Sequence, residues 1–167
     1  MKSAGAAMGC RVLCHTAQRH DHALSAGAGS YRARSRSGFL SQKLLTTASH
    51  SCCRALCDHK RNLTDEQLKK LFEAGGYVGV NFFGRFLAPK GDITLDLVAD
   101  HLEHMLEMGG EGKIGFGSDF DGCSLKPIHL DDPSGLPLLM DVCNRRFGEK
   151  ITRGIAGENL LKYYDRI

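Results

Sequence analysis

The sequence predicts an α/β fold built on parallel strands, and three observations lead to this prediction. From about residue 44 onward, short apolar or β-branched runs alternate with longer amphipathic stretches. The run Tyr77–Phe83 (YVGVNFF) is almost continuously apolar, which is typical of a strand buried on both faces of a parallel sheet. The composition, with 42% hydrophobic and 25% charged residues over 167 positions, suits one globular domain with a core of its own.

The first predicted strand is the β-rich run LLTTAS at residues 44–49, which ends at His50. After a polar loop, Thr64 is a suitable N-cap for a helix with acidic residues in its first turn. Gly75-Gly76 is the expected end of that helix. Its apolar positions fall on one face: Leu68, Leu71 and Phe72.

The strand YVGVNFF comes next, followed by a helix that starts after Thr94 and closes at Gly109-Gly110. A third strand covers Ile114–Gly117 and leads into the acidic turn SDFDG. Helices are expected at roughly 134–146 and 149–165. Three parallel strands are few for a free-standing domain, so we expect the C-terminal part of a (β/α)₈ TIM-type barrel.

Residues 1–47 differ in composition from the rest and are expected to form a basic, disordered arm. Residues 1–48 hold seven Lys/Arg and one acid (7 − 1 = +6), whereas the remainder holds 15 basic and 18 acidic residues (15 − 18 = −3). Three interpretations stay open: a transit peptide, an arm that contacts anions, or sequence that does not belong to the domain at residues 48–167. The folded part has no basic stripe interleaved with aromatics, so no nucleic-acid partner is expected.

The seven cysteines are odd in number, so they cannot all pair within one chain, and free thiols in a reducing compartment are expected. No run approaches the length of a membrane-spanning helix, and the closing LLKYYDRI is not a hydrophobic anchor signal. We therefore expect a cytoplasmic protein without a membrane partner.

Polar residues stand where each predicted strand ends, and these are the candidates for chemistry. They are His50, Asn81 and Asp119. In α/β barrels the active site lies at the carboxyl ends of the strands. A histidine and a carboxylate on neighbouring strand ends can bind a divalent metal or move a proton of its bound water. The alternatives are a hydrogen-bonded structural histidine and a loop whose acids bond backbone N–H groups.

Several motifs together resemble the membrane (renal) dipeptidase family of zinc peptidases. They are ASHSCCRALCDHKRNLTDEQL, GYVGVNFF, DHLEHM, IGFGSDFDG and IAGENLLKYYDRI, in this order from about Ala48 to Ile167. The resemblance implies a (β/α)₈ barrel with two zinc ions as cofactors and a dipeptide as substrate. By the same resemblance, His50 matches a zinc ligand and Arg61 an arginine that binds the substrate carboxylate. Asp119 matches an aspartate that handles a proton beside the metals, and Asn81 a residue that lines the substrate site.

The sequence also departs from the family. Its first-strand HxD zinc pair, the bridging glutamate and two further histidines have no counterpart, and His20-Asp21-His22 lacks a preceding strand. One metal ligand of about five is kept, and a zinc site needs three or four. We therefore expect a truncated metallodipeptidase with little or no activity of its own.

Two other functions stay open. The first is a non-catalytic remnant or partner-binding fragment, because a three-stranded sheet leaves unpaired edges that favour association, such as a homo-oligomer. The second is a small zinc-binding module made by His50, Cys52, Cys53, Cys57 and His59. The pair His101 and His104 is expected on a solvated helix face, since acids surround it and no HExxH pattern is present.

Overall fold

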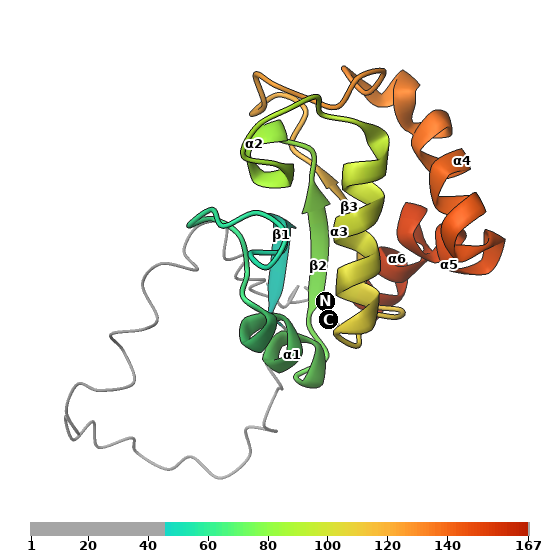
Figure 1. Ribbon diagram of the computed structural model, residues 1–167. Helices are drawn as coiled ribbons and strands as arrows, with labels where there is room; N and C mark the ends of the chain where they lie inside the picture. The colour runs from blue at the N-terminus through green and yellow to red at the C-terminus, as the bar shows by residue number, and fades with distance from the viewer. Residues whose placement is uncertain (1–45, 167) are drawn as a thin grey trace, which may run out of the picture.

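The computed structural model describes residues 46–166, which form one parallel sheet with helices around it (Figure 1). The strands are β1 (Thr47–Ser51), β2 (Tyr77–Asn81) and β3 (Ile114–Ser118), in the order β1-β2-β3. Both strand pairs are parallel, with Ala48 opposite Val78 and Val78 opposite Ile114. The predicted α/β class with three parallel strands is confirmed. The expectations for the arm at 1–47 fall almost wholly outside the described residues.

The helices are α1 (Asp65–Glu73), α2 (Gly84–Leu87), α3 (Leu95–Glu107), α4 (Leu136–Phe147), α5 (Glu149–Arg153) and α6 (Asn159–Tyr164). A 3₁₀ turn, η1 (Pro133–Gly135), precedes α4, and a wide π-type turn, η2 (Gly154–Glu158), separates α5 from α6. Two predictions need correction here. The short helix α2 was not foreseen, and the stretch predicted as one helix over 149–165 is interrupted where Gly157 leaves helical geometry.

The helices α1 and α3 end in the same way. Gly75 and Gly109 adopt positive φ values of 78° and 92°, which glycine reaches without steric cost. The following glycines donate backbone hydrogen bonds back into the helix, Gly76 to Leu71 and Gly110 to Met105. This is the Schellman arrangement, and it confirms both helix ends predicted from the Gly-Gly pairs.

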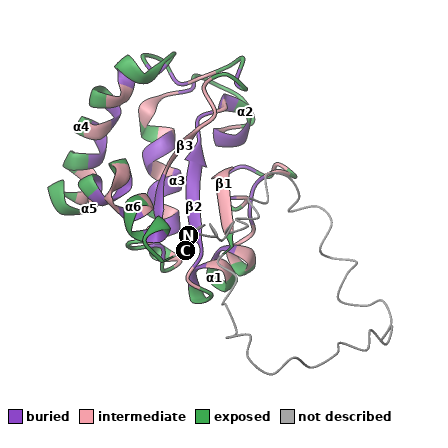
Figure 2. Ribbon diagram, turned by 180° about the vertical axis from the view of Figure 1, so that it is seen from behind, coloured by how far each residue is buried: buried purple, intermediate pink, exposed green. Residues whose placement is uncertain are grey.

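The core lies around β2, whose five residues are all buried (Figure 2). Val78 and Val80 are 0% exposed and belong to a cluster with Leu102 of α3 and Ile114 of β3. In contrast, four of the five residues of β1 are only partly buried. The central strand therefore has the two-sided burial that its apolar run predicted, while β1 lies at the edge of the sheet.

Two glycines allow the strands to approach one another closely. A Cβ added at Gly79 or at Gly117 would collide with the carbonyl oxygen of Ser49, and the two glycines also face each other. Only backbone atoms fit at this level of the sheet. Around Gly79 and Gly117, the surface of the sheet is therefore formed by main-chain atoms.

The histidines of α3 correct another prediction. His101 is 1% exposed rather than solvated. Its Nδ1 accepts a hydrogen bond from the backbone N–H of Cys53 at 3.0 Å, and its Nε2 lies 3.1 Å from the carbonyl oxygen of Leu87. His104 is also largely covered and pairs with Asp65 at 2.8 Å. The loop after β1 and helix α2 cover this face of α3, which the charges along α3 did not reveal.

Among residues 46–166, no helix is both long enough and apolar enough to cross a membrane.

Candidate functional site

The carboxyl ends of the strands bring Asn81 and Asp119 into contact. Asn81 is the last residue of β2, and Asp119 follows the last residue of β3. The side-chain Nδ2 of Asn81 donates a hydrogen bond to Oδ2 of Asp119 at 3.2 Å. Two of the residues singled out in the sequence therefore form one polar pair at the edge where parallel barrels place their sites.

A bulge in the sheet creates this pair. Val80 pairs with Phe116, but the next residue, Asn81, pairs with Ser118, so Gly117 is an extra residue on β3. An extra residue bends a strand locally and redirects the side chains that follow it. Here it brings Ser118 level with Asn81, so that the next side chain, Asp119, comes within reach of the Asn81 amide.

The turn after β3 holds Asp119 in an unusual backbone conformation. Its φ is +67°, a left-handed value that aspartate tolerates better than most residues. The N–H of Gly122 donates to the carbonyl oxygen of Asp119 at 3.0 Å and closes the turn. A Cβ at Gly122 would collide with the Asp119 carboxylate, so glycine at this position leaves room for the carboxylate.

Asn81 is 0% exposed, and its side chain makes further contacts. Its Oδ1 accepts a hydrogen bond from the backbone N–H of Phe83 at 2.6 Å. The thiol of Cys123 lies 3.6 Å from the same oxygen. Sequence reasoning missed Cys123 as a neighbour of the site, although its place directly after the turn could have indicated it.

His50 lies near the end of β1, the edge strand, and is half-buried. Its Nδ1 is hydrogen-bonded to the hydroxyl of Ser49 at 2.8 Å. The hydroxyl of Ser51 donates to the carbonyl oxygen of Arg61 at 3.1 Å, which ties Arg61 to the end of the same strand. His50 and Arg61 are thus on the same edge as Asn81 and Asp119, but the structure gives them no direct contact with that pair.

The guanidinium of Arg61 lies 5.7 Å from the ring centroid of Phe86, within the range of a cation–π contact. Phe86 belongs to the unpredicted helix α2, which is joined to the loop after β1 by a buried amide. The Nδ2 of Asn62 donates to the carbonyl oxygens of Cys57 and Phe86, each at 2.8 Å. Sequence reasoning therefore found Arg61 but missed the aromatic surface against which it lies.

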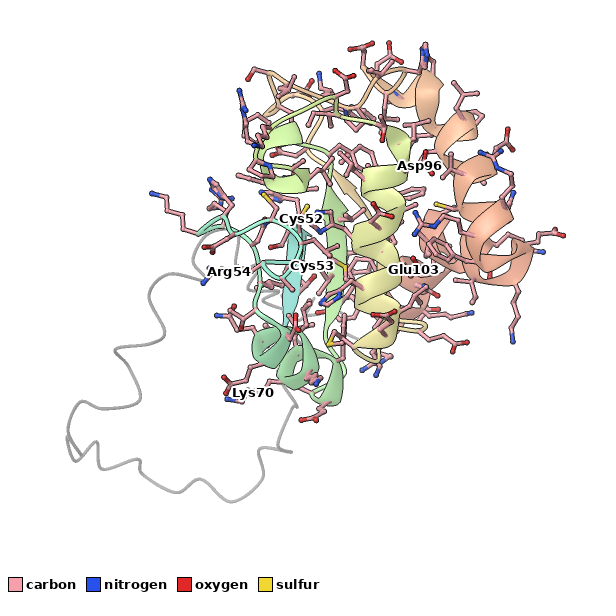
Figure 3. All side chains as sticks on the ribbon, in the orientation of Figure 1. Cys52, Cys53, Arg54, Lys70, Asp96 and Glu103 are labelled. Carbon is pink, nitrogen blue, oxygen red and sulfur yellow. The ribbon has the colours of Figure 1, made fainter. Side chains whose placement is uncertain are left out.

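The cysteines near β1 do not form a metal cluster. The thiols of Cys52, Cys53 and Cys57 donate to the carbonyl oxygens of Asn81, His101 and Arg85. Figure 3 shows Cys52 and Cys53 directly after β1, beside the central strand. Burial raises the pKa of the Cys52 thiol well above its usual value and that of Cys53 to about 12. The three thiols are directed at three separate carbonyl oxygens, and residues 46–166 hold no group of three donors that could bind a metal, which contradicts the interpretation of this segment as a zinc module.

The donors of a dinuclear metal centre are likewise not brought together in the described part of the chain. Within the described range 46–166, no three His, Cys, Asp or Glu side chains lie together so that they could hold a metal ion. His50 is a suitable nitrogen donor, but one donor does not make a zinc site. The described residues therefore do not fit a complete metal centre.

A groove of about 390 Å³ lies along α3, and none of the candidate residues His50, Arg61, Asn81 or Asp119 lines it. Its acidic residues already have partners. Arg146 of α4 bonds Asp100 at 2.6 Å and also bonds Glu103, which Figure 3 labels on the side of α3 that faces α4. We therefore locate the candidate site at the strand ends.

The comparisons with known proteins identify relatives of this chain. Among curated relatives, an uncharacterized dipeptidase of Schizosaccharomyces pombe is 37% identical over 71% of this chain and 29% of its own length. Dipeptidase verJ of Clonostachys rogersoniana is 34% identical over 71% of this chain and 31% of its own length. This chain thus spans about a third of the length of the relatives it matches.

Among solved structures, a metallopeptidase of Rhodobacter sphaeroides superposes with a TM-score of 0.68 at 34% identity, covering 72% of this chain and 36% of that one. That protein was crystallised with a phosphinate mimic of the dipeptide L-Ala-D-Ala. The sequence profile of membrane dipeptidases (peptidase family M19) matches residues 46–167. The chain therefore belongs to the membrane dipeptidase family.

Proposed function

We propose that this chain carries the substrate-binding and proton-transferring part of a zinc dipeptidase site, as the C-terminal portion of a (β/α)₈ barrel. In this proposal His50 is a metal ligand, Arg61 binds the carboxylate of the dipeptide, and Asn81 lines the site. Asp119 takes a proton from the attacking water and delivers it to the leaving amine nitrogen as the amide bond breaks. The observation that carries the proposal is the Asn81–Asp119 pair at the strand-end edge of a dipeptidase-family chain.

The surroundings of each residue support its role. Metal-binding histidines usually hydrogen-bond their second ring nitrogen to another group, and Ser49 provides such a partner for His50. The planar guanidinium of Arg61 suits a carboxylate, and its contact with Phe86 restricts its orientation. Since the described residues lack the other metal donors, the chain alone is expected to hydrolyse dipeptides slowly or not at all.

The proposal is tested by adding L-Ala-D-Ala to the purified full chain with and without zinc, while NMR shifts and hydrolysis are followed. We expect weak binding that moves the signals of Arg61, Asn81 and Asp119, with little or no hydrolysis. Arg61→Met should weaken this binding about tenfold or more, because a charge-assisted bond to the carboxylate is lost. Arg85→Met, which removes an exposed arginine of α2, is the matched control and should leave binding unchanged.

Two results would count against the proposal. If neither binding nor hydrolysis is seen at millimolar dipeptide, these residues do not form a dipeptide site. If the wild-type chain shows rapid zinc-dependent hydrolysis, its metal donors are complete and the incomplete-site part of the proposal is wrong.

A second candidate is a non-catalytic fragment that binds a partner through its open sheet edge. The observation in its favour is that β1 is an edge strand whose residues are mostly only half-buried. Light scattering of the purified chain across a concentration series tests it. A stable homo-oligomer would support this function, and a monomer at all concentrations would oppose self-association through the edge.

A further inference from the structure

We propose that Asn81 is a positioning residue, which holds the Asp119 carboxylate in one orientation toward the site. This inference rests on the proposed function of Asp119 as the proton-transferring group. It assigns Asn81 a role beyond lining the site. Three features of the described structure carry it: the fixed orientation of the Asn81 amide, its hydrogen bond to the carboxylate and the burial of Asn81 itself.

The hydrogen-bond partners of Asn81 permit only one orientation of its amide. The N–H of Phe83 can only donate, so it requires Oδ1 on its side, at 2.6 Å. The carboxylate of Asp119 can only accept while it is ionised, so it requires Nδ2 on its side, at 3.2 Å. A flipped amide would place donor against donor and acceptor against acceptor. The orientation is thus determined by chemistry on both sides.

The carboxylate lies between Asn81 and Gly122. Its Oδ2 receives the Asn81 bond, and its Oδ1 faces Gly122, where any Cβ would collide with it. The left-handed backbone of Asp119 and the closed turn fix the direction in which its Cα–Cβ bond points. The remaining freedom of Asp119 is rotation about its side-chain bonds. The Asn81 bond opposes this rotation, and the Cys123 thiol also lies beside the carboxylate.

The environment favours a strong bond. Asn81 is 0% exposed, so water has little access to its amide, whereas Asp119 is only partly buried. The neighbouring thiol of Cys123 has its pKa raised to about 11, mainly by burial, so it stays protonated and adds no negative charge beside the carboxylate. A bond to an ionised acceptor is roughly twice as strong as a neutral one.

The test measures the side-chain rotamers of Asp119 by NMR couplings in the isotopically labelled full chain. In the wild type we expect one rotamer. In Asn81→Leu, which has a similar volume but no hydrogen-bonding groups, we expect couplings averaged over several rotamers. A single unchanged rotamer of Asp119 in folded Asn81→Leu would overturn the proposal.

Because Asn81 is buried, its leucine variant can fail to fold, so a second variant tests the same bond from the other side. Asp119→Asn keeps the left-handed backbone accessible but replaces the ionised acceptor. The side-chain amide protons of Asn81 should then exchange with water about tenfold faster. The matched control is Asp121→Asn, an exposed carboxylate in the same turn, which should leave the exchange unchanged. Equal exchange in wild type and Asp119→Asn would also overturn the proposal.

Neither NMR measurement needs hydrolysis, so these signals test the positioning role even in a chain without activity. The proposed function is tested separately, by the binding of L-Ala-D-Ala. Where hydrolysis of L-Ala-D-Ala is measurable, Asn81→Leu should lower kcat about tenfold and change KM less than about twofold. A loss confined to KM would instead make Asn81 a substrate-binding residue and overturn its assignment as a positioning residue.

Discussion

The first two strand–helix units of this chain have the same plan but are stabilised differently. In each, a candidate site residue lies at or next to the last position of the strand, a threonine precedes the helix, and a Gly-Gly pair closes the helix. In the unit β1–α1, the strand is half-buried, while Thr64 makes a full capping box with Gln67. In the unit β2–α3, the strand is fully buried, while Thr94 makes no capping hydrogen bond.

This difference in strand burial corresponds to a difference in how the two site residues, Asn81 and His50, are held in place. Asn81, at the end of the buried strand, has defined partners on both sides of its amide. His50, on the edge strand, bonds its own neighbour Ser49. Tertiary packing therefore organises the second unit and its half of the site, whereas local interactions have a larger share in the first. Three pairs of variants, one pair for each kind of interaction, test this contrast.

The largest effect is expected from removing core volume under the second unit. Leu102→Ala empties a position that is 0% exposed and should lower the free energy of unfolding by about 2–5 kcal/mol. Leu71→Ala, at a partly buried position of α1, should cost only about 1 kcal/mol. Urea unfolding followed by circular dichroism measures both. Equal losses would show that the two units depend on packing to the same extent.

The next effect concerns His101, which joins the two units through Cys53 and Leu87. Burial, as the largest cause, lowers the pKa of His101 below its usual 6.5, although nearby Asp100 raises it and His104 lowers it. The unfolded chain therefore binds this proton at a higher pH than the folded chain. The stabilising contribution is complete above about pH 6.5 and is lost as the pH falls, by at most about 1.4 kcal/mol per unit from this one group.

Urea unfolding between about pH 7.5 and pH 5.5, above the range in which most carboxylates titrate, measures this slope. His101→Gln should flatten it, because no proton is taken up at this position. His129→Asn, at an exposed histidine, should retain the wild-type slope. A slope that survives in His101→Gln would assign the pH dependence to other groups.

The smallest effect is expected at the helix starts. Thr64→Ala removes a side chain that accepts from Gln67 N–H, and should cost about 1 kcal/mol of unfolding free energy. Thr94→Ala removes no capping bond and should cost no more than a few tenths of a kcal/mol. Thermal unfolding of the two variants side by side shows the difference. Similar losses would mean that Thr94 caps its helix in solution.

These two threonines also show what could be predicted from the sequence. Both helices were predicted at the correct places, because apolar periodicity and the Gly-Gly pairs are local signals. The residue three positions on decides whether a capping box can be completed: the Gln67 side chain accepts from the Thr64 N–H, whereas the Leu97 side chain has no group that could accept from the Thr94 N–H. The sequence thus indicates the helix start better than the way in which it is stabilised.

Features that depend on distant contacts could not be predicted in the same way. Helix α2 lies inside an apolar run without helical periodicity, and its carbonyl oxygens are bonded by Asn62 and Cys57 from another loop. His101 has charged sequence neighbours but is covered by segments far away in the chain. The strand-end positions of Asn81 and Asp119 followed from parallel topology, whereas their bond required the bulge at Gly117, which leaves no pattern in the sequence.

The close approach of Gly79 and Gly117 to Ser49 has a consequence for how this chain tolerates change. A library of all single substitutions, sorted only for folded protein, should be nearly empty at these two glycines, since even alanine would push the strands apart. The same library should accept many residues at half-buried His50. Selection for folding and selection for chemistry would thus act on different residues only a few ångströms apart.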